Sequence, residues 1–401
     1  MRGIRSKWGI DGYKITMGLI FRYLNVTLGM NIQGRWEYLD RDQTHNPDSH
    51  ADNLRDRLGE YSTLSPEPDI ERYVADQWDW MPPDHLRWYN HIFSFDPSQL
   101  YIYQKNGELK VTTEGPIHTA TYWEIPLLRE DACLLTEELG HTPQPGWRQE
   151  HESDARFLYD ENVGYAEGGG RRPFSAEHHY DALAIYANHR KSIGREGSSG
   201  GLYGTSFFSL AYDFNLKPMG TMGHEFPLLT AGIWGYELAN IKAMELWIEH
   251  FGKAGYFLPD TFGTKFALRD FNHRYASFFM GLRQDSGNPY WFTDLVLDHY
   301  QKIGIKSQTK TIIYSNSIYS RPEILQLRDY KVGKIQKSML FGKFITNRCG
   351  WTARNTVSKL VAVKVGEKPW KDVAKLSDDL GKSTGKQSEV EHLLNIVQKY
   401  T

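Results

Sequence analysis

Residues 292–315, FTDLVLDHYQKIGIKSQTKTIIYS, hold the pattern that decides the fold class. The first half of this stretch carries side chains at helical spacing and predicts a helix over 292–303: Leu295, Val296, His299, Tyr300 and Ile303. The second half ends in a β-branched run over 309–315, which predicts a short buried strand. A helix that leads directly into a buried strand is the αβ unit of a parallel sheet or an α/β barrel.

The same helical spacing recurs upstream, over residues 237–251. Its apolar side chains form a stripe that we expect to face the core: Leu238, Ile241, Met244, Ile248 and Phe251. Near the C-terminus, residues 357–365 alternate like a strand, and residues 390–397 predict a closing helix.

The N-terminal part predicts a hairpin between two polar loops. Residues 100–104 and 109–113 are rich in β-forming side chains and flank Lys105-Asn106-Gly107-Glu108. Asn-Gly supplies the positive φ of a type I′ turn, so the two runs predict paired strands. The polar stretches 40–56 and 64–70 predict loops or a poorly packed insertion.

Together these elements predict an α/β core over residues 126–345, flanked by an α+β layer drawn from both ends of the chain. We expect residues 1–125 to form its N-terminal part and residues 346–401 to return and pair with it. A chain of 401 residues is long enough for two such domains.

Composition excludes several classes of protein. Lys and Arg number 47 and Asp and Glu 49, a net charge of −2, which argues against coating DNA or binding a membrane through a polybasic patch. The 40% hydrophobic and 24% charged residues exclude disorder, collagen and coiled coil. Cys133 and Cys349 allow no disulfide framework and no cysteine zinc site. With neither an apolar leader nor a run of membrane-span length, we expect a cytoplasmic protein.

Two glycine-rich segments precede polar residues. Gly168-Gly169-Gly170 stands before Arg171-Arg172, and the segment 197–204 stands before Thr205-Ser206. Backbone N–H groups in such loops can cradle phosphates, and a double arginine adds bidentate anion contacts. Taken alone, each segment is better explained as a flexible connection.

His224 lies between Gly223 and Glu225. A histidine in this setting can act as acid, base, metal ligand or phosphoryl acceptor, and the neighbouring carboxylate is expected to hold its second ring nitrogen. The alternative is a surface histidine without a chemical role. The adjacent pair His178-His179 is weak evidence for a metal site.

Arg283 and Asp285 alternate at a predicted strand end and therefore share a face. The carboxylate suits the diol of a ribose, and the guanidinium suits a carboxylate or phosphate. The alternative is that Asp285 only caps the helix that follows. A basic tract over 328–348 is either a solvated face or an anion site.

In this order and spacing, the motifs resemble those of the nicotinate phosphoribosyltransferase family along nearly the whole chain. The matching segments are Asp11-Gly12-Tyr13-Lys14-Ile15-Thr16-Met17, Gly115-Pro116, Trp123-Glu124-Ile125-Pro126-Leu127-Leu128, residues 167–172, Gly204-Thr205-Ser206, Gly220-Thr221-Met222-Gly223-His224-Glu225, residues 283–289 and Lys375-Leu376-Ser377-Asp378. The resemblance implies an irregular α/β barrel core beside an α+β domain. It also implies that nicotinate and phosphoribosyl pyrophosphate yield nicotinate mononucleotide and pyrophosphate, with Mg²⁺ on the pyrophosphate. No nucleic acid or membrane is implied.

The resemblance further implies ATP hydrolysis through a phosphohistidine at His224. By analogy, Asp285 grips the ribose hydroxyls, Arg283 faces nicotinate or the reacting sugar, and Thr221 lies beside the ring. Ser286-Gly287 belongs to the same substrate site.

The remaining implied contacts come from other segments. Tyr13 stacks on the pyridine ring from a neighbouring subunit, which implies a homodimer with shared active sites. Arg171 and Arg172 bind phosphate, and Glu167 contributes to the substrate site. Three residues bind the 5′-phosphate: Gly342, Lys343 and Thr346.

Some positions depart from the family pattern. Gly168 replaces an aromatic residue, and Asn316 replaces an aspartate. The segment 341–346, which corresponds to the phosphate loop of the family, lacks the second glycine of that loop. The bulky Phe344 is expected to obstruct close approach of its backbone to the 5′-phosphate. Two alternatives therefore stand beside the main hypothesis: a nicotinamide phosphoribosyltransferase, which Asn288 also fits, and a degenerate paralogue that only binds a pyridine or a nucleotide.

Overall fold

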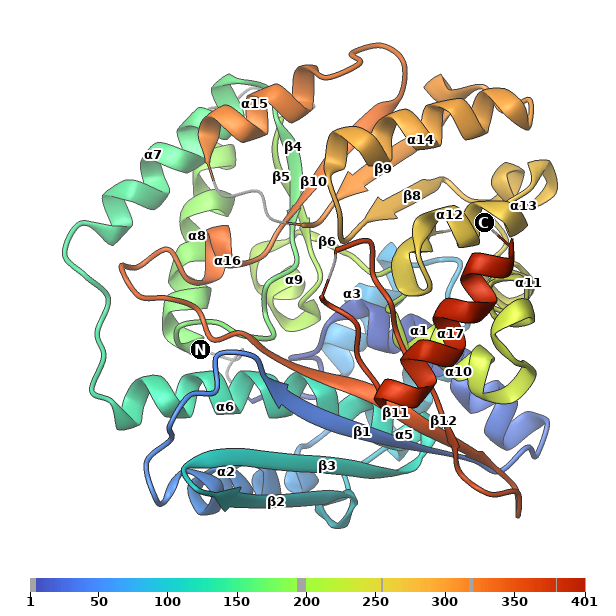
Figure 1. Ribbon diagram of the computed structural model, residues 1–401. Helices are drawn as coiled ribbons and strands as arrows, with labels where there is room; N and C mark the ends of the chain where they lie inside the picture. Colours follow the sequence, from blue (N-terminus) through green and yellow to red (C-terminus); the bar gives the residue numbers. More distant parts are fainter. Residues whose placement is uncertain (1–4, 193–199, 254, 317–319, 380, 401) are drawn as a thin grey trace. The chain divides into compact units, whose positions relative to one another are not determined.

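The computed structural model (Figure 1) describes residues 5–192, 200–253, 255–316, 320–379 and 381–400. The chain divides into two compact units. The first unit holds Met1–Leu19, Trp36–Gly220 and Leu340–Ser358. The second holds Ile20–Arg35, Thr221–Met339 and Lys359–Thr401. Residues 197–199 of the second glycine-rich segment lie outside the described residues. The predicted boundaries at 125 and 345 remain a prediction.

Antiparallel strands of the first unit include the predicted hairpin. Strands β2 (Leu100–Lys105) and β3 (Glu108–Pro116) pair from Leu100 opposite Thr113 to Lys105 opposite Glu108 (Figure 1). The turn residues Asn106 and Gly107 have φ values of 53° and 79°, as a type I′ turn requires. This prediction is confirmed. Strand β1 (Ile32–Asp40) contributes its residues from Trp36 onward to this unit.

Parallel strands and helices complete the first unit. Strands β4 (Gly164–Glu167), β5 (Gly201–Thr205) and β6 (Lys217–Pro218) pair in parallel in the order β6-β5-β4. The helices are α1 (Gly12–Arg22, up to Leu19), α2 (His50–Gly59), α3 (Pro68–Gln77), α4 (Pro83–Arg87), α5 (Ile117–Ala120), α6 (Glu124–Glu138), α7 (Trp147–Asp160), α8 (Ala176–Ser192), α9 (Phe208–Phe214) and α16 (Lys343–Thr346).

Helices α2 and α3 correct part of the expectation of loops in the polar stretches: residues 41–49 and 64–67 are loops, but 50–56 and 68–70 are helical. Leu54 and Leu58 lie one turn apart on α2 and are buried, so a short apolar stripe was enough to order this segment. Pro68 occupies the first turn of α3, where a missing N–H costs nothing. The proline therefore starts a helix instead of marking a loop.

The second unit contains the predicted αβ unit. Strands β7 (Tyr256–Phe257), β8 (Gly281–Gln284), β9 (Thr311–Tyr314) and β10 (Gln336–Phe341, up to Met339) are parallel, in the order β10-β9-β8-β7. Its helices are α10 (Glu225–Trp234), α11 (Tyr236–Phe251), α12 (Thr264–Asp270), α13 (His273–Phe278), α14 (Pro289–Lys302), α15 (Arg321–Asp329) and α17 (Gln387–Tyr400). Helix α14 leads into β9, as predicted. Strands β11 (Thr356–Val365, from Lys359) and β12 (Lys371–Asp372) pair antiparallel.

The stripe predicted on α11 is rotated in the structure. Leu238 is 44% exposed, whereas Ala239, Ala243 and Trp247 are almost fully buried. The small alanines let α10 pack closely on this face. The helix was predicted correctly, but its buried face was only partly right.

The α/β class is confirmed, because parallel strands alternate with helices in both units. Antiparallel strands come from the N-terminal and C-terminal parts of the chain. Among the described residues, no helix has the length and apolar character needed to cross a membrane.

Candidate active site

Strand β8 carries the first part of a polar cluster in the second unit. Gly281, Leu282 and Gln284 are buried, while Arg283 is partly exposed and Asp285 follows the strand directly. The next helix, α14, is capped by Asn288, whose side chain accepts hydrogen bonds from the N–H groups of its first turn. Asp285 is therefore not the helix cap and is free for another role.

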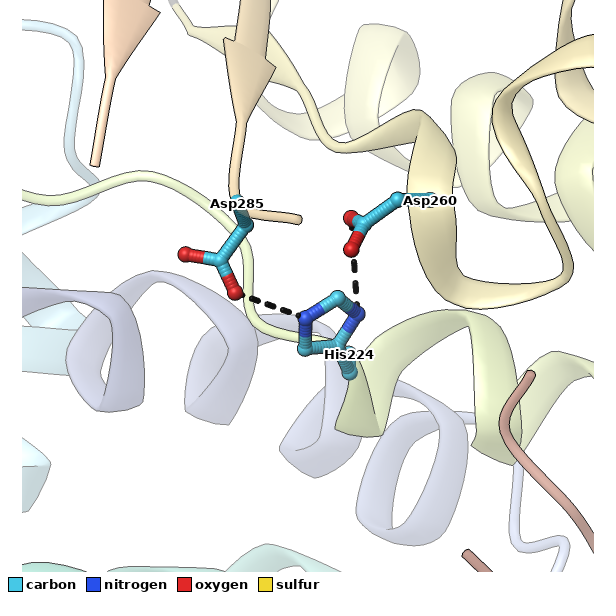
Figure 2. Close-up of side chains that lie close together, drawn as sticks. All are labelled: His224, Asp260 and Asp285. Atoms are coloured by element: carbon cyan, nitrogen blue, oxygen red, sulfur yellow. Dashed lines mark hydrogen bonds and ion pairs between the residues drawn. The ribbon is translucent and has the colours of Figure 1, made fainter. Parts of the chain in front are cut away.

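His224 lies at the N-cap of α10 and contacts Asp285 (Figure 2). Its Nε2 is 3.0 Å from Asp285 Oδ2, and its Nδ1 is 3.0 Å from the hydroxyl of Thr261. Asp260 Oδ1 lies 3.9 Å from Nδ1. The carboxylate on the imidazole thus comes from a residue 61 positions away, and the expectation that neighbouring Glu225 would hold it was wrong.

Burial keeps the imidazole of His224 neutral, with help from one nearby cation. Burial and the Lys375 ammonium lower the pKa of His224 to about 4, although the carboxylates of Asp260 and Asp285 oppose the shift. Burial would raise the pKa of Asp285, but Arg283 and His224 hold it well below its usual range. Near neutral pH the pair is therefore a neutral imidazole beside an ionised carboxylate.

Asp285 has further partners on its second oxygen. The hydroxyl of Ser315 donates to Asp285 Oδ1 at 2.8 Å, and a guanidinium nitrogen of Arg283 lies 3.7 Å from the same atom. Arg283 also donates to the hydroxyl of Thr221 at 3.0 Å. Thr221, His224, Arg283 and Asp285 thus lie together, as the sequence motifs predicted.

The sequence did not single out Asp260 as a site residue. Asp260 is 1% exposed and lies in the short helix η6 (Pro259–Thr261), two residues after β7. The hydroxyl of Ser286 donates to Asp260 Oδ2 at 2.5 Å, and Lys375 lies 3.7 Å from the same oxygen. A carboxylate placed just after a parallel strand is the signal that could have found it.

His224, Asp260 and Asp285 each offer one atom to a region no more than 4.8 Å across, so they could hold a metal ion. A mixed imidazole and carboxylate set suits zinc-like ions better than Mg²⁺, which prefers an all-oxygen shell. For a Mg²⁺ ion that arrives with a pyrophosphate, the partly exposed Asp285 is the ligand of this set that fits.

Tyr13 belongs to a second cluster, in the first unit. Its hydroxyl donates to Glu124 at 2.9 Å, and Lys14 Nζ lies 2.8 Å from the same carboxylate. Arg171 lies 3.5 Å from Glu124, and its guanidinium carbon is 5.9 Å from the Tyr13 ring centre. The sequence placed Tyr13 and Arg171 in the site, and Glu124 is the buried carboxylate that joins them.

Glu167 is fully buried beside the glycine-rich loop. The hydroxyl of Thr205 donates to it at 2.6 Å, the backbone N–H of Gly169 donates to it, and His179 lies 3.4 Å away. Burial would raise the pKa of Glu167, but these partners lower it below its usual value. The structure thus places Glu167 where it shapes the loop.

Arg172, the second arginine after this loop, donates to the backbone oxygen of Thr356 at 3.0 Å.

The segment 341–346, which the resemblance assigns to the 5′-phosphate, lies against the glycine-rich loop. A Cβ added to Gly169 would come within 2.8 Å of the Gly342 backbone, so only glycine allows this approach. A Cβ on Gly168 would meet the side chain of Leu340 at 2.8 Å, so a larger residue here would require Leu340 to shift. Thr346 is 1% exposed, and its hydroxyl bonds within the loop.

Phe344 does not obstruct this loop. It is 4% exposed, and its ring packs 4.9 Å from that of Phe341. The side chain therefore fills the core and leaves Gly342 and Lys343 partly exposed. The expectation of an obstruction was wrong because it considered only the size of the ring and not its direction.

Three basic residues of the tract pair with carboxylates. Arg328 pairs with Asp329, Lys331 lies 3.4 Å from Asp294, and Arg348 lies 2.7 Å from the buried Asp154. The first two pairs are solvent-exposed and fit the solvated-face interpretation.

Comparison with known proteins places these clusters in a family. The family model described as the nicotinate phosphoribosyltransferase (NAPRTase) family matches residues 165–400, and that of its N-terminal domain matches residues 10–130. The chain belongs to the nicotinate phosphoribosyltransferase family. It is an enzyme of this family, and both clusters lie within the matched regions.

Individual relatives are similar to this chain along nearly all of their length. The nicotinate phosphoribosyltransferase of Desulforapulum autotrophicum is 32% identical over 99% of this chain and 99% of its own. That of Chromohalobacter salexigens is 28% identical over 95% of both chains. The crystal structure of nicotinate phosphoribosyltransferase from Porphyromonas gingivalis is similar with a TM-score of 0.89 and 27% identity, over 98% of this chain and 100% of the other.

Proposed function

We propose that this enzyme transfers the phosphoribosyl group of phosphoribosyl pyrophosphate to nicotinate, in a step of NAD salvage that ATP hydrolysis drives through a phosphohistidine at His224. The ring nitrogen of nicotinate forms a bond to C1′ as the bond from C1′ to the pyrophosphate oxygen breaks. Nicotinate mononucleotide and pyrophosphate leave. The observation that carries this proposal is the contact between the neutral His224 and the ionised Asp285.

Asp285 is suited to the ribose. As the C1′–O bond breaks, positive charge develops on the sugar, and a fixed carboxylate nearby stabilises it. The second oxygen of Asp285 is oriented by Ser315, so the carboxylate has a defined direction before substrate binds. Arg283 supplies the positive charge that a nicotinate carboxylate would need, and Thr221 fixes the position of that guanidinium. Ser286 and Gly287 complete the substrate loop.

The first-unit cluster is suited to the ring and the phosphates. We propose that Tyr13 stacks on the pyridine ring of a nicotinate bound in the neighbouring subunit. The active enzyme would then be a homodimer with shared sites. Arg171 and Arg172 are assigned to phosphate groups. The partly exposed Gly342 and Lys343 support binding of the 5′-phosphate. The resemblance assigned Thr346 to this phosphate and Glu167 to the substrate, but both side chains are buried, so we assign them instead to shaping the loops of this site.

His224 is suited to accept a phosphoryl group because a neutral imidazole keeps a lone pair. The unprotonated ring nitrogen attacks the γ-phosphorus of ATP, the bond from this phosphorus to the β–γ bridging oxygen breaks, and ADP leaves. Water later hydrolyses the phosphohistidine. Both ring nitrogens are hydrogen-bonded in the structure, one to Asp285 and one to Thr261, so one of these bonds has to open first. Mg²⁺ would neutralise phosphate charge on the substrates.

The two alternatives receive less support. Asn288 caps α14, so its presence is explained by folding and not by a preference for nicotinamide. Phe344 is directed into the core, which removes one reason to suspect a degenerate paralogue.

One assay tests the proposal. The purified protein is given phosphoribosyl pyrophosphate and Mg²⁺ with nicotinate or nicotinamide, each with and without ATP, and mononucleotides are identified by mass. We expect nicotinate mononucleotide, in a yield that rises with ATP. Product from nicotinamide alone would favour the first alternative, and no product from either pyridine would favour the second.

A further inference from the structure

The segment from Lys375 to Asp379 contacts two loops beside the His224–Asp285 pair, the one after β7 and the one after β8. Its backbone is held by Leu376, whose N–H donates to the carbonyl of Thr261 at 2.9 Å. Thr261 is also the residue whose hydroxyl contacts His224. Thr261 therefore links this C-terminal segment to the imidazole of His224.

The same segment holds the loop after β8. The backbone N–H of Asp378 donates to the hydroxyl of Ser286 at 3.0 Å, and the carboxylate of Asp379 accepts from the N–H of Gly287 at 3.0 Å. Ser286 in turn donates to Asp260. Two consecutive acids thus fix two consecutive loop residues, which follow Asp285 directly.

Asp378 anchors this segment through its side chain. Its carboxylate accepts from both the N–H and the hydroxyl of Thr264, the first residue of α12, with the N–H at 2.8 Å. The residue before this helix is Gly263, at φ 93°, which has no side chain to cap it. Asp378 therefore supplies the missing cap from a distant part of the chain.

We propose that Asp378 is a positioning residue for the phosphoribosyl-transfer site: it anchors residues 375–379 on α12, and these residues fix the loop that carries Asp285 and Ser286. The inference rests on the proposed function for the meaning of that loop. Asp378 touches neither Asp285 nor His224 in any contact described above, so it acts through Ser286 and Gly287 and not on a substrate.

A matched pair of variants tests this role. Asp378→Ala removes the anchor, and Asp378→Asn keeps the shape of the side chain while removing its charge. Asp372→Ala is the control, because Asp372 lies in the same C-terminal region and pairs with the exposed Lys386. The first readout is amide hydrogen exchange of a peptide spanning residues 285–288 in the substrate-free protein. The second is the KM for phosphoribosyl pyrophosphate against kcat for the full reaction.

We expect exchange in residues 285–288 to rise roughly tenfold or more in Asp378→Ala, since the hydrogen bond from the Gly287 N–H to Asp379 loses its support. The KM should rise by a similar factor, with a smaller effect in Asp378→Asn and none in Asp372→Ala. Equal exchange in Asp378→Ala and Asp372→Ala would overturn the positioning role. If the wild-type enzyme formed no mononucleotide, the proposed function would be overturned instead. The exchange data would still test whether Asp378 positions the loop, because they are measured without substrate.

Discussion

Asp285 Oδ2 lies 3.0 Å from His224 Nε2, so the residue assigned to the ribose is hydrogen-bonded to the residue assigned to ATP. The same carboxylate oxygen cannot bind the imidazole and a ribose hydroxyl with full strength at once. This competition links the two half-reactions physically, because any change at His224 alters what Asp285 is free to bind.

Replacing the imidazole tests the first half-reaction. His224→Ala should abolish ATP hydrolysis while leaving some ATP-independent transfer, because the ribose and pyridine groups of the site remain. The measurement is ADP release beside nicotinate mononucleotide formation in one time course. A variant that hydrolyses ATP at the wild-type rate would remove His224 from the phosphohistidine role.

Asp285→Ala tests the second half-reaction. Removing the carboxylate should lower kcat by about 10² or more, as expected for loss of a fixed charge that stabilises the transition state. Ser315→Ala, which removes only the group that orients Asp285 Oδ1, should have a smaller effect on kcat. Near-normal kinetics in Asp285→Ala would exclude it from the ribose site.

The pH dependence tests the charge balance around the imidazole. The folded pKa of His224, about 4, lies below its ordinary value, so phosphorylation should stay flat as the pH falls from 7.5 and decline only toward pH 4. Because Lys375 lowers this pKa, Lys375→Met should raise it and move the decline to higher pH. Single-turnover phosphorylation across this range is the measurement. Lys386→Met, at an exposed ion pair, is the control, and coincident profiles for both variants would contradict the assigned cause.

The same shift affects stability in a defined direction. The unfolded chain binds a proton at His224 below about pH 6.5, whereas the folded chain binds it only near pH 4. The contribution of His224 is therefore fully present above pH 6.5 and is lost as the pH falls through this window.

Asn288→Ala separates folding from specificity. Loss of the N-cap of α14 should lower the free energy of unfolding by about 1 kcal/mol, while the ratio of nicotinate to nicotinamide turnover stays the same. Denaturant unfolding and the two-substrate assay measure these effects. A changed ratio with unchanged stability would restore Asn288 as a specificity residue.

Local sequence predicted those parts of the site that local geometry controls. Arg283 and Asp285 share a face because side chains alternate along β8, and the Asn-Gly turn fixed the hairpin. Asp260 was missed, and Asp378 was noted only as part of a motif, because their contacts join segments far apart in the chain, which no local pattern encodes. The direction of Phe344 was missed because the sequence gives the size of its ring but not how the short helix α16 packs against α8.

A mixing experiment tests whether the site is shared. Tyr13→Ala should raise the KM for nicotinate, and Tyr13→Phe, which keeps the ring but loses the hydrogen bond to Glu124, should raise it less. If Tyr13 serves the partner's site, subunits carrying Tyr13→Ala mixed with subunits carrying Asp285→Ala form mixed dimers with one intact site. In a twofold dimer with random exchange, half of the dimers are mixed and each regains one of two sites, so about a quarter of the wild-type activity should return. Activity that only equals the sum of the two separate variants would place Tyr13 in its own subunit's site.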